Sequence, residues 1–178
     1  MNLIAKITDE NIGEISIEMN NPNTRIAVRT ILLDENGNIG ILHKTIKNEY
    51  KLVGGGVDEG ENLEEALRRE TLEESGCKID IISYLGYIEE LRSKKNFYQK
   101  SYIYVCKVIE NTHHLDLTQK EKEEGAEICW LQPNEALEIM KTSFHKLKPS
   151  KYADLYATNF VVTRDISILK YYIENCNK

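Results

Sequence analysis

The chain has 178 residues, enough for one domain with a sizeable core and too few for two of comfortable size. Hydrophobic residues make up 41% of the sequence and charged residues 29%, which is ordinary for a globular protein. The formal net charge of −6 argues against non-specific binding to nucleic acid polymers or membranes. No apolar run approaches the roughly 20 residues of a membrane-spanning helix.

The first residues and the cysteines indicate the cellular compartment in which the protein is expected. The first residues lack the basic-then-apolar order of a secretory signal. The four cysteines are far apart and form no CxxC pair, so neither structural zinc nor a disulfide framework is expected. We therefore expect a protein of the reducing cytoplasm.

Two stretches early in the chain predict a β-hairpin. Residues 25–33 and 39–44 are suited to strands, and the turn between them contains Asn36-Gly37. Asn-Gly is a strong signal for a tight hairpin turn, because both residues tolerate positive φ angles. The first twenty residues are ambiguous.

A helix is predicted after a glycine-rich turn. Asn62 is suited to the N-cap position, and Glu65, three residues later, completes a capping box. Gly76 stands where a helix commonly ends on glycine. We therefore expect a helix between Asn62 and Gly76.

The rest of the chain predicts further strands and two more helices. Residues 78–91, 97–109 and 127–131 are suited to strands. Pro133 suits the first turn of a helix, and residues 163–175 have an amphipathic helical pattern. This order of elements indicates a mixed α/β or α+β domain.

The first predicted helix carries an acidic patch. Glu70, Glu73 and Glu74 lie three and four residues apart, so their carboxylates share one face. This clustering of like charges gains nothing structural unless a cation lies among the oxygens. Hard oxygen ligands suit Mg²⁺ or Mn²⁺, so the patch predicts a metal site.

Neighbouring residues can support such a site. Arg69 can pair with Glu73 or Glu65, four residues away, and hold a carboxylate still. Glu61 lies at the end of the loop before the helix. It could have a structural role at the start of the helix or support catalysis, and both roles stay open. Close approach of a ligand to the backbone is permitted by three consecutive glycines, Gly54, Gly55 and Gly56.

The spacing of these residues resembles the Nudix box, the signature GX5EX7REUXEEXGU of the Nudix hydrolase family. Two apolar positions of the box hold Thr71 and Cys77, and Val53 replaces a proline common before the glycines. Every fixed position matches, at Gly55, Glu61, Arg69-Glu70, Glu73-Glu74 and Gly76.

The resemblance implies an α/β/α sandwich around a mixed β-sheet. It covers about residues 24–141, which we expect to be the core of a single domain spanning residues 1–178. The resemblance does not explain residues 142–178, for which we expect a C-terminal helical extension.

The resemblance also implies hydrolysis of a nucleoside diphosphate linked to another group, X, with Mg²⁺ or Mn²⁺. Carried over by position, Glu70 and Glu74 would be the principal metal ligands, and Glu73 an auxiliary ligand that supports catalysis. The Gly54 carbonyl would complete the shell, and Arg69 would orient the carboxylates. Metal-bound water would then be the nucleophile.

A carboxylate is needed as general base for that water, and in the family it lies in the box or on a later loop. The later loop here has the sequence TQKEKEEGAE. Glu124 is our choice for this role, and its rivals are Glu121, Glu123 and Glu127.

Lys44 and the glycines are the predicted substrate-binding residues. Lys44 ends a strand ahead of the glycine loop, where family members often place a basic residue on a substrate phosphate. A solvated lysine fits the same position. Gly55 and Gly56 would let the substrate approach the backbone.

The expected substrate is a small nucleotide. Signatures of several subfamilies are missing: Arg92 stands where ADP-ribose enzymes often have proline, and Lys94 where diadenosine polyphosphate enzymes often have tyrosine. A nucleoside triphosphate or modified nucleotide is therefore favoured. The alternatives are an ADP-ribose or nucleotide-sugar pyrophosphatase, or a non-catalytic nucleotide-binding regulator. The C-terminal helix could contribute to a homodimer interface.

Overall fold

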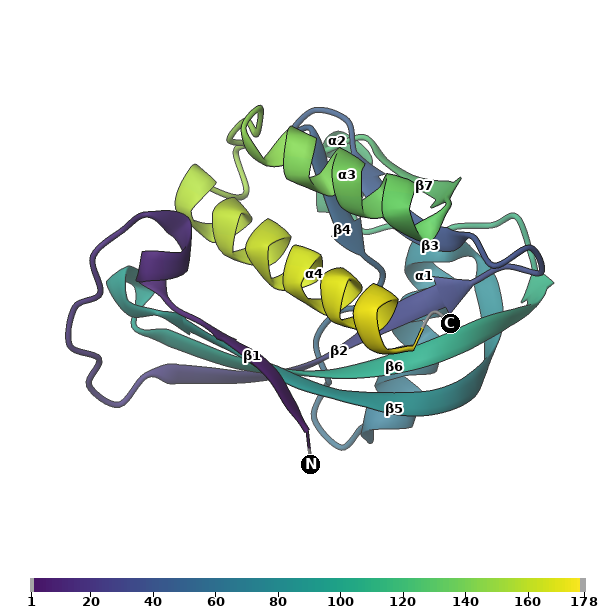
Figure 1. The fold of residues 1–178 in the computed structure, drawn as a ribbon, viewed down its shortest axis with the longest axis horizontal. Coiled ribbons are helices and arrows are strands. Elements are labelled where there is room, and N and C mark those ends of the chain that lie inside the picture. Colours follow the sequence, from purple (N-terminus) through teal and green to yellow (C-terminus); the bar gives the residue numbers. More distant parts are fainter. Residues whose placement is uncertain (1, 177–178) are drawn as a thin grey trace.

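A mixed β-sheet runs through the centre of the computed structural model, which describes residues 2–176 (Figure 1). Within this range the sheet has seven strands: β1 (Leu3–Ile7), β2 (Asn23–Leu33), β3 (Ile39–Lys44), β4 (Glu49–Leu52), β5 (Cys77–Arg92), β6 (Phe97–Asn111) and β7 (Ala126–Leu131). Their order is β1-β5-β6-β2-β3-β4, and β7 pairs with β3. β1 is parallel to β5 and β2 to β6, whereas the other pairs are antiparallel.

Helices cover both faces of this sheet. α1 (Leu63–Ser75) packs on one face, in an apolar cluster with Val28 and Leu32 of β2. α3 (Pro133–Phe144) and α4 (Leu155–Asn175) pack on the other face, around Ile31 and Ile103. The short α2 (Gln119–Glu123) precedes β7. The expected α/β/α sandwich with an additional C-terminal helix is confirmed (Figure 1).

The local signals for the hairpin and the first helix are confirmed. The Asp34 N–H donates to the Asn38 carbonyl at 3.0 Å across the predicted turn. The Asn62 side chain accepts hydrogen bonds from the N–H groups of Glu64 and Glu65, both at 3.0 Å. Gly76 ends α1 with a φ of 70°, a left-handed conformation that glycine adopts without steric cost.

Several elements differ from the sequence-based expectations. The ambiguous N-terminal segment contains β1 and a 3₁₀ helix, Asp9–Ile12; a second 3₁₀ helix, Ser93–Lys95, joins β5 to β6. β4 was not predicted, because its buried Glu49 and Lys51 break the apolar pattern of a strand. α4 begins eight residues before position 163, because the Asp154 side chain accepts from the Ala157 N–H at 2.8 Å and caps it.

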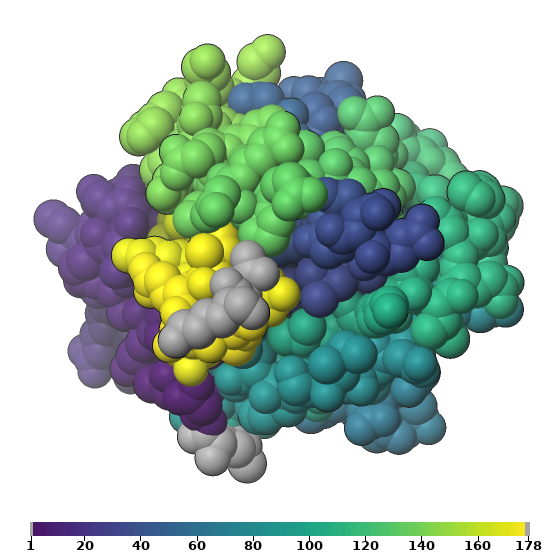
Figure 2. Space-filling view, turned by 45° about the vertical axis from the view of Figure 1, so that its right-hand side comes forward, coloured from purple at the N-terminus to yellow at the C-terminus, as the bar shows by residue number. Residues whose placement is uncertain are grey.

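Two adjacent residues of α4 fix this helix to the sheet. Asp165 accepts a hydrogen bond from the backbone N–H of Leu52 in β4 at 2.9 Å. Arg164 donates to Glu90 in β5 at 3.1 Å, and both side chains are fully buried. In Figure 2, the yellow end of α4 lies between the purple N-terminal segment and the green region of α3. Within residues 2–176, no helix is long and apolar enough to cross a membrane.

We expect Asn62→Ala to lower the free energy of unfolding by about 1 kcal/mol, because two N–H groups at the start of α1 lose their acceptor. Urea denaturation would measure the change. Asn20→Ala is the matched control, since that asparagine is exposed. Equal stability of the two variants would contradict the capping role.

Candidate functional site

A glycine loop, residues 53–57, follows β4 and runs beside β2. The N–H groups of Val28 and Thr30 donate to the carbonyls of Gly55 and Val53, at 2.9 and 3.0 Å. Gly54 has a φ of 131°, and a Cβ atom there would collide with the Val28 carbonyl. A Cβ atom on Gly55 would collide with the Glu70 carboxylate. Glycine at these two positions therefore lets the loop lie between β2 and α1.

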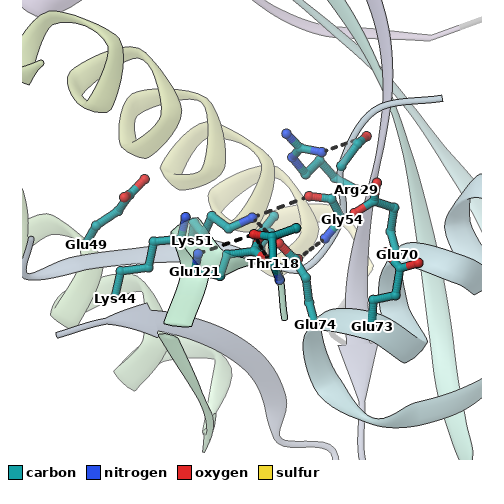
Figure 3. Close-up of polar contacts among 12 residues, drawn as sticks. Arg29, Lys44, Glu49, Lys51, Gly54, Glu70, Glu73, Glu74, Thr118 and Glu121 are labelled. Carbon is teal, nitrogen blue, oxygen red and sulfur yellow. Dashed lines mark hydrogen bonds and ion pairs between the residues drawn. The ribbon is translucent and has the colours of Figure 1, made fainter. Parts of the chain in front are cut away.

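Glu74 of α1 points into this loop (Figure 3). Its carboxylate is 3% exposed and accepts hydrogen bonds from the Gly54 N–H at 2.8 Å and from Lys51 Nζ at 2.7 Å. Burial raises the pKa of Glu74, while the charge of Lys51 and the two hydrogen bonds oppose this shift by favouring the carboxylate. Glu74 thus joins α1 to both β4 and the glycine loop.

Arg69 connects the other acidic residues to the same loop. Its Nε and Nη2 donate to the two carboxylate oxygens of Glu61, each at 2.9 Å, and Nη2 also donates to the Gly56 carbonyl. Its Nη1 donates to Glu70 at 2.9 Å and to Glu73 at 3.2 Å. The hydrogen bonds that Arg69 donates to Glu61 and Glu70 raise its pKa, so it stays charged. Of the two partners predicted for Arg69, Glu73 is the one it contacts.

The oxygen atoms around Gly54 suit a hard divalent cation. Lys51 Nζ lies 2.7 Å from a Glu74 oxygen and 3.4 Å from the Gly54 carbonyl oxygen, so this oxygen pair already holds a side-chain cation. Carboxylate and carbonyl oxygens are the donors that Mg²⁺ and Mn²⁺ prefer. Among residues 2–176, no three acidic, histidine or cysteine side chains converge on one point, because Glu70 is turned toward Arg69. The donor chemistry fits a metal, and Lys51 is its competitor.

A cavity of about 460 Å³ lies beside the glycine loop, between the sheet, α2 and α4. Its acidic lining residues are Glu49, Glu70, Glu74 and Glu121. Cationic side chains outnumber them: Arg25, Arg29, Lys44, Lys47, Lys51, Arg92, Lys120 and Arg164. Such a lining suits phosphate groups, which arginine and lysine bind through charge-assisted hydrogen bonds.

The four acidic residues of the later loop have different surroundings. Glu121 lines the cavity and accepts hydrogen bonds from the N–H and hydroxyl of Thr118, at 3.0 and 2.7 Å. Burial would raise the pKa of Glu121, but these hydrogen bonds and the charges of Lys51 and Lys44 together outweigh burial and lower it. Glu123 accepts from Tyr152 at 2.7 Å, and Glu127 lies 3.1 Å from His43.

Glu124 and Lys44 form a buried ion pair. Lys44 Nζ donates to Glu124 at 2.8 Å, and the Ser150 hydroxyl donates to the second carboxylate oxygen at 2.6 Å. Glu124 is 1% exposed and is absent from the cavity lining, whereas Lys44 reaches the cavity wall. Burial would lower the pKa of Lys44, but the hydrogen bond to Glu124 and the charges of Glu49, Glu124 and Glu121 together outweigh burial and raise it. The ammonium of Lys44 therefore already has an acceptor.

Of the eight cationic residues that line the cavity, only Lys44 was predicted from the sequence as a site residue. Arg29 interrupts the apolar run of β2, and this charge was the signal available for it, whereas Lys51 lies in β4, which was not predicted as a strand. Arg164 lies in the C-terminal helix, and nothing in its local pattern links it to the box. These residues come together only through the fold.

Comparisons with known proteins agree with the fold and the motif. The family model described as the NUDIX domain matches residues 23–153. An RNA pyrophosphohydrolase from Sulfurovum sp. (strain NBC37-1) is 40% identical over 57 residues, which is 32% of this chain; the chain spans 36% of that relative's length.

Two solved structures share the fold. A MutT protein from Methanosarcina mazei Go1 has a TM-score of 0.53 and 18% identity, with 88% of this chain and 99% of that chain covered. A UDP-X diphosphatase has a TM-score of 0.56 and 14% identity, with 91% of this chain and 67% of that chain covered. Because the family model spans most of the sequence and the box is complete, the chain belongs to the Nudix hydrolase family.

Proposed function

We propose that this protein hydrolyses the diphosphate bond of a nucleotide-type substrate with the help of Mg²⁺ or Mn²⁺. The observation that carries the proposal is the position of Glu74, which is buried against the Gly54 backbone and lines a cavity rich in cationic side chains. We expect a small-molecule substrate and action in the cytoplasm. A homodimer also stays a prediction, which a measurement of mass in solution would test.

Each part of the box has a proposed role. Glu70, Glu74 and the Gly54 carbonyl would hold the metal, with Glu73 as an auxiliary ligand. When bound, the metal would neutralise diphosphate oxygens and lower the pKa of the attacking water. Arg69 would keep the carboxylates aimed, because it is itself fixed on Glu61 and Gly56. Gly55 and Gly56 would give the substrate access to the backbone, and Lys44 stays a candidate phosphate ligand.

Glu121 is a better candidate for the general base than Glu124. Its carboxylate lines the cavity, and a base must lie within hydrogen-bond reach of the attacking water, directly or through one other water. Glu124 is held by Lys44 and Ser150, so both of its oxygens have partners. We therefore propose Glu121 for this role and a structural role for Glu124.

Several substrates remain in the proposal. A nucleoside triphosphate or modified nucleotide is favoured, followed by ADP-ribose or a nucleotide sugar. The partial likeness to an RNA pyrophosphohydrolase adds RNA to the substrates worth testing. A regulator that binds nucleotides without cleaving them is the competing class, and it would show ligand binding without turnover.

We expect metal-dependent release of phosphate or pyrophosphate from one group in a panel of these substrates. Glu74→Gln should lower turnover by about 100-fold or more, because the amide cannot supply the negative charge that the metal needs. Glu64→Gln, an exposed change on the same helix, is the matched control. If the wild-type protein binds a ligand of the panel but turns none over, the result would favour a regulator that binds nucleotides without cleaving them.

Gly55→Ala should weaken Mn²⁺ binding by about tenfold, because the new methyl group would displace the Glu70 carboxylate. Titration followed by electron paramagnetic resonance would measure the affinity. Glu59→Gln is the control within the box, since that side chain is exposed. Equal affinity in both variants would show that Glu70 does not need its observed position.

Glu121→Gln and Glu124→Gln should separate the base from the structural residue. We expect Glu121→Gln to lower kcat by about 100-fold with little loss of stability. Glu124→Gln should lower the free energy of unfolding by about 3 kcal/mol, because the buried Lys44 loses its charged partner. Steady-state kinetics and urea denaturation would measure these effects, and the reverse pattern would restore the base role to Glu124.

A further inference from the structure

Three arginines of the cavity have buried nitrogen atoms without hydrogen-bond partners. They are Nε of Arg29 in β2, Nε of Arg92 at the end of β5, and Nη2 of Arg164 in α4. Among the described residues, only two other buried side-chain atoms lack partners. Buried polar groups in folded proteins are nearly always hydrogen-bonded, so a cluster of exceptions in one cavity indicates a missing acceptor.

The nearby carboxylates cannot supply that acceptor. Glu90 accepts from Arg92 Nη2 at 2.6 Å, from Arg164 Nη1 at 3.1 Å and from Gln99 at 2.7 Å. Asp165 accepts from Arg164 Nε at 2.6 Å and from the Leu52 N–H at 2.9 Å. Arg164 therefore uses two of its nitrogen atoms on the protein, and its third nitrogen is buried without a partner in a side chain that lines the cavity.

Arg29 lines the same cavity as Arg164 and is held in a fixed position. Its Nη1 donates to the carbonyls of Val28 and Gly55, at 2.6 and 3.2 Å, which holds the guanidinium beside the glycine loop. Burial and the charge of Arg164 lower the pKa of Arg29 to about 10, so it is still protonated at neutral pH. Two buried like charges that line one cavity and repel each other favour an anion in that cavity.

Arg92 differs from the other two arginines, because its guanidinium lies over aromatic rings. Its Cζ atom is 5.3 Å from the ring centre of Phe97 and 5.5 Å from that of Phe160. Cation–π contacts of this kind partly satisfy an arginine. Arg29 and Arg164 are therefore the pair left with donors for a ligand.

We propose that Arg29 and Arg164 bind a phosphate group of the substrate. Two planar guanidinium groups suit the oxygens of a phosphate, which accept paired hydrogen bonds. The proposal rests on the proposed function, because it takes the phosphate from a substrate that reaches the glycine loop. It also goes beyond the family domain, since Arg164 lies outside residues 23–153.

Helix α4 thereby becomes a wall of the active site. Thr158, Val161 and Arg164 follow one another at intervals of three residues, so they share one face of the helix, and all three line the cavity. The C-terminal extension would thus select substrates with a phosphate group at this position.

Arg164→Lys is the variant that tests the subsite. A lysine keeps the positive charge facing Glu90 and Asp165 but has no third nitrogen for the cavity. We expect the affinity for inorganic pyrophosphate, measured by calorimetry without metal, to fall about tenfold. The KM of the best substrate in the panel should rise by a similar factor and change more than kcat.

Two further variants keep the test decisive. Arg29→Lys should weaken pyrophosphate binding in the same way, and it decides the question if Arg164→Lys does not fold. Arg68→Lys is the matched control, because that arginine donates to the Ile79 carbonyl from α1, away from the cavity.

The outcomes separate this proposal from the proposed function. If the wild type cleaves a substrate but folded arginine variants keep its KM and pyrophosphate affinity, the subsite is wrong and the function stands. If the arginine variants lose pyrophosphate binding while the wild type cleaves nothing, the subsite stands and the function is wrong. Wild-type protein that does not bind pyrophosphate would overturn the subsite directly.

Discussion

The contact between the glycine loop and helix α1 is the constraint on which the rest of the site depends. Three side chains of α1 reach the loop. Glu74 accepts a hydrogen bond from the Gly54 N–H, Glu70 lies against Gly55, and Arg69 donates a hydrogen bond to the Gly56 carbonyl. Each contact needs either a residue without a side chain or a backbone orientation in which the N–H or carbonyl group faces the helix. A larger residue at either of the first two glycines would push the carboxylates away from β4 and the cavity. The motif therefore encodes the close approach of charged side chains of α1 to the backbone of the glycine loop.

The functional groups of the site are paired with one another in the absence of ligands. Lys51 holds Glu74, Arg69 holds Glu70, and Glu124 holds Lys44. Pairing lowers the cost of removing each charge from water, which would otherwise destabilise the domain. A bound metal could take the place of Lys51 beside Glu74 and of Arg69 beside Glu70. The ammonium group of Lys51 would then be free to bind a phosphate group of the substrate. The Lys44–Glu124 pair is less suited to such an exchange, because Ser150 donates to the second oxygen of the Glu124 carboxylate.

The sequence predicted those features that depend on residues close together in the chain. The cap at Asn62, the turn at Asn36-Gly37 and the acidic face of α1 each follow from a few adjacent residues. The cavity does not, because it joins side chains from β2, β4, α2 and α4. For the same reason the sequence could not distinguish the roles of Glu121 and Glu124, which are three residues apart in one short acidic stretch. Only the contacts with Lys44 and Ser150, which come from distant parts of the chain, show that Glu124 is the enclosed one. The long reach of α4 was missed because its capping residue, Asp154, follows a polar segment without a helical pattern.

The distribution of charge explains how an acidic protein can accept phosphates. The whole chain carries a net charge of −6, yet eight cationic and four acidic side chains line the cavity. The field inside a cavity with low-dielectric walls depends on its nearest charges, whereas exposed charges more than about 10 Å away are screened by salt. The cavity can therefore attract a small anion although the chain as a whole is acidic. Arg164 contributes to this local excess from a helix that packs on the sheet through its own ion pairs, so the same residue links the stability of the extension to the charge of the site.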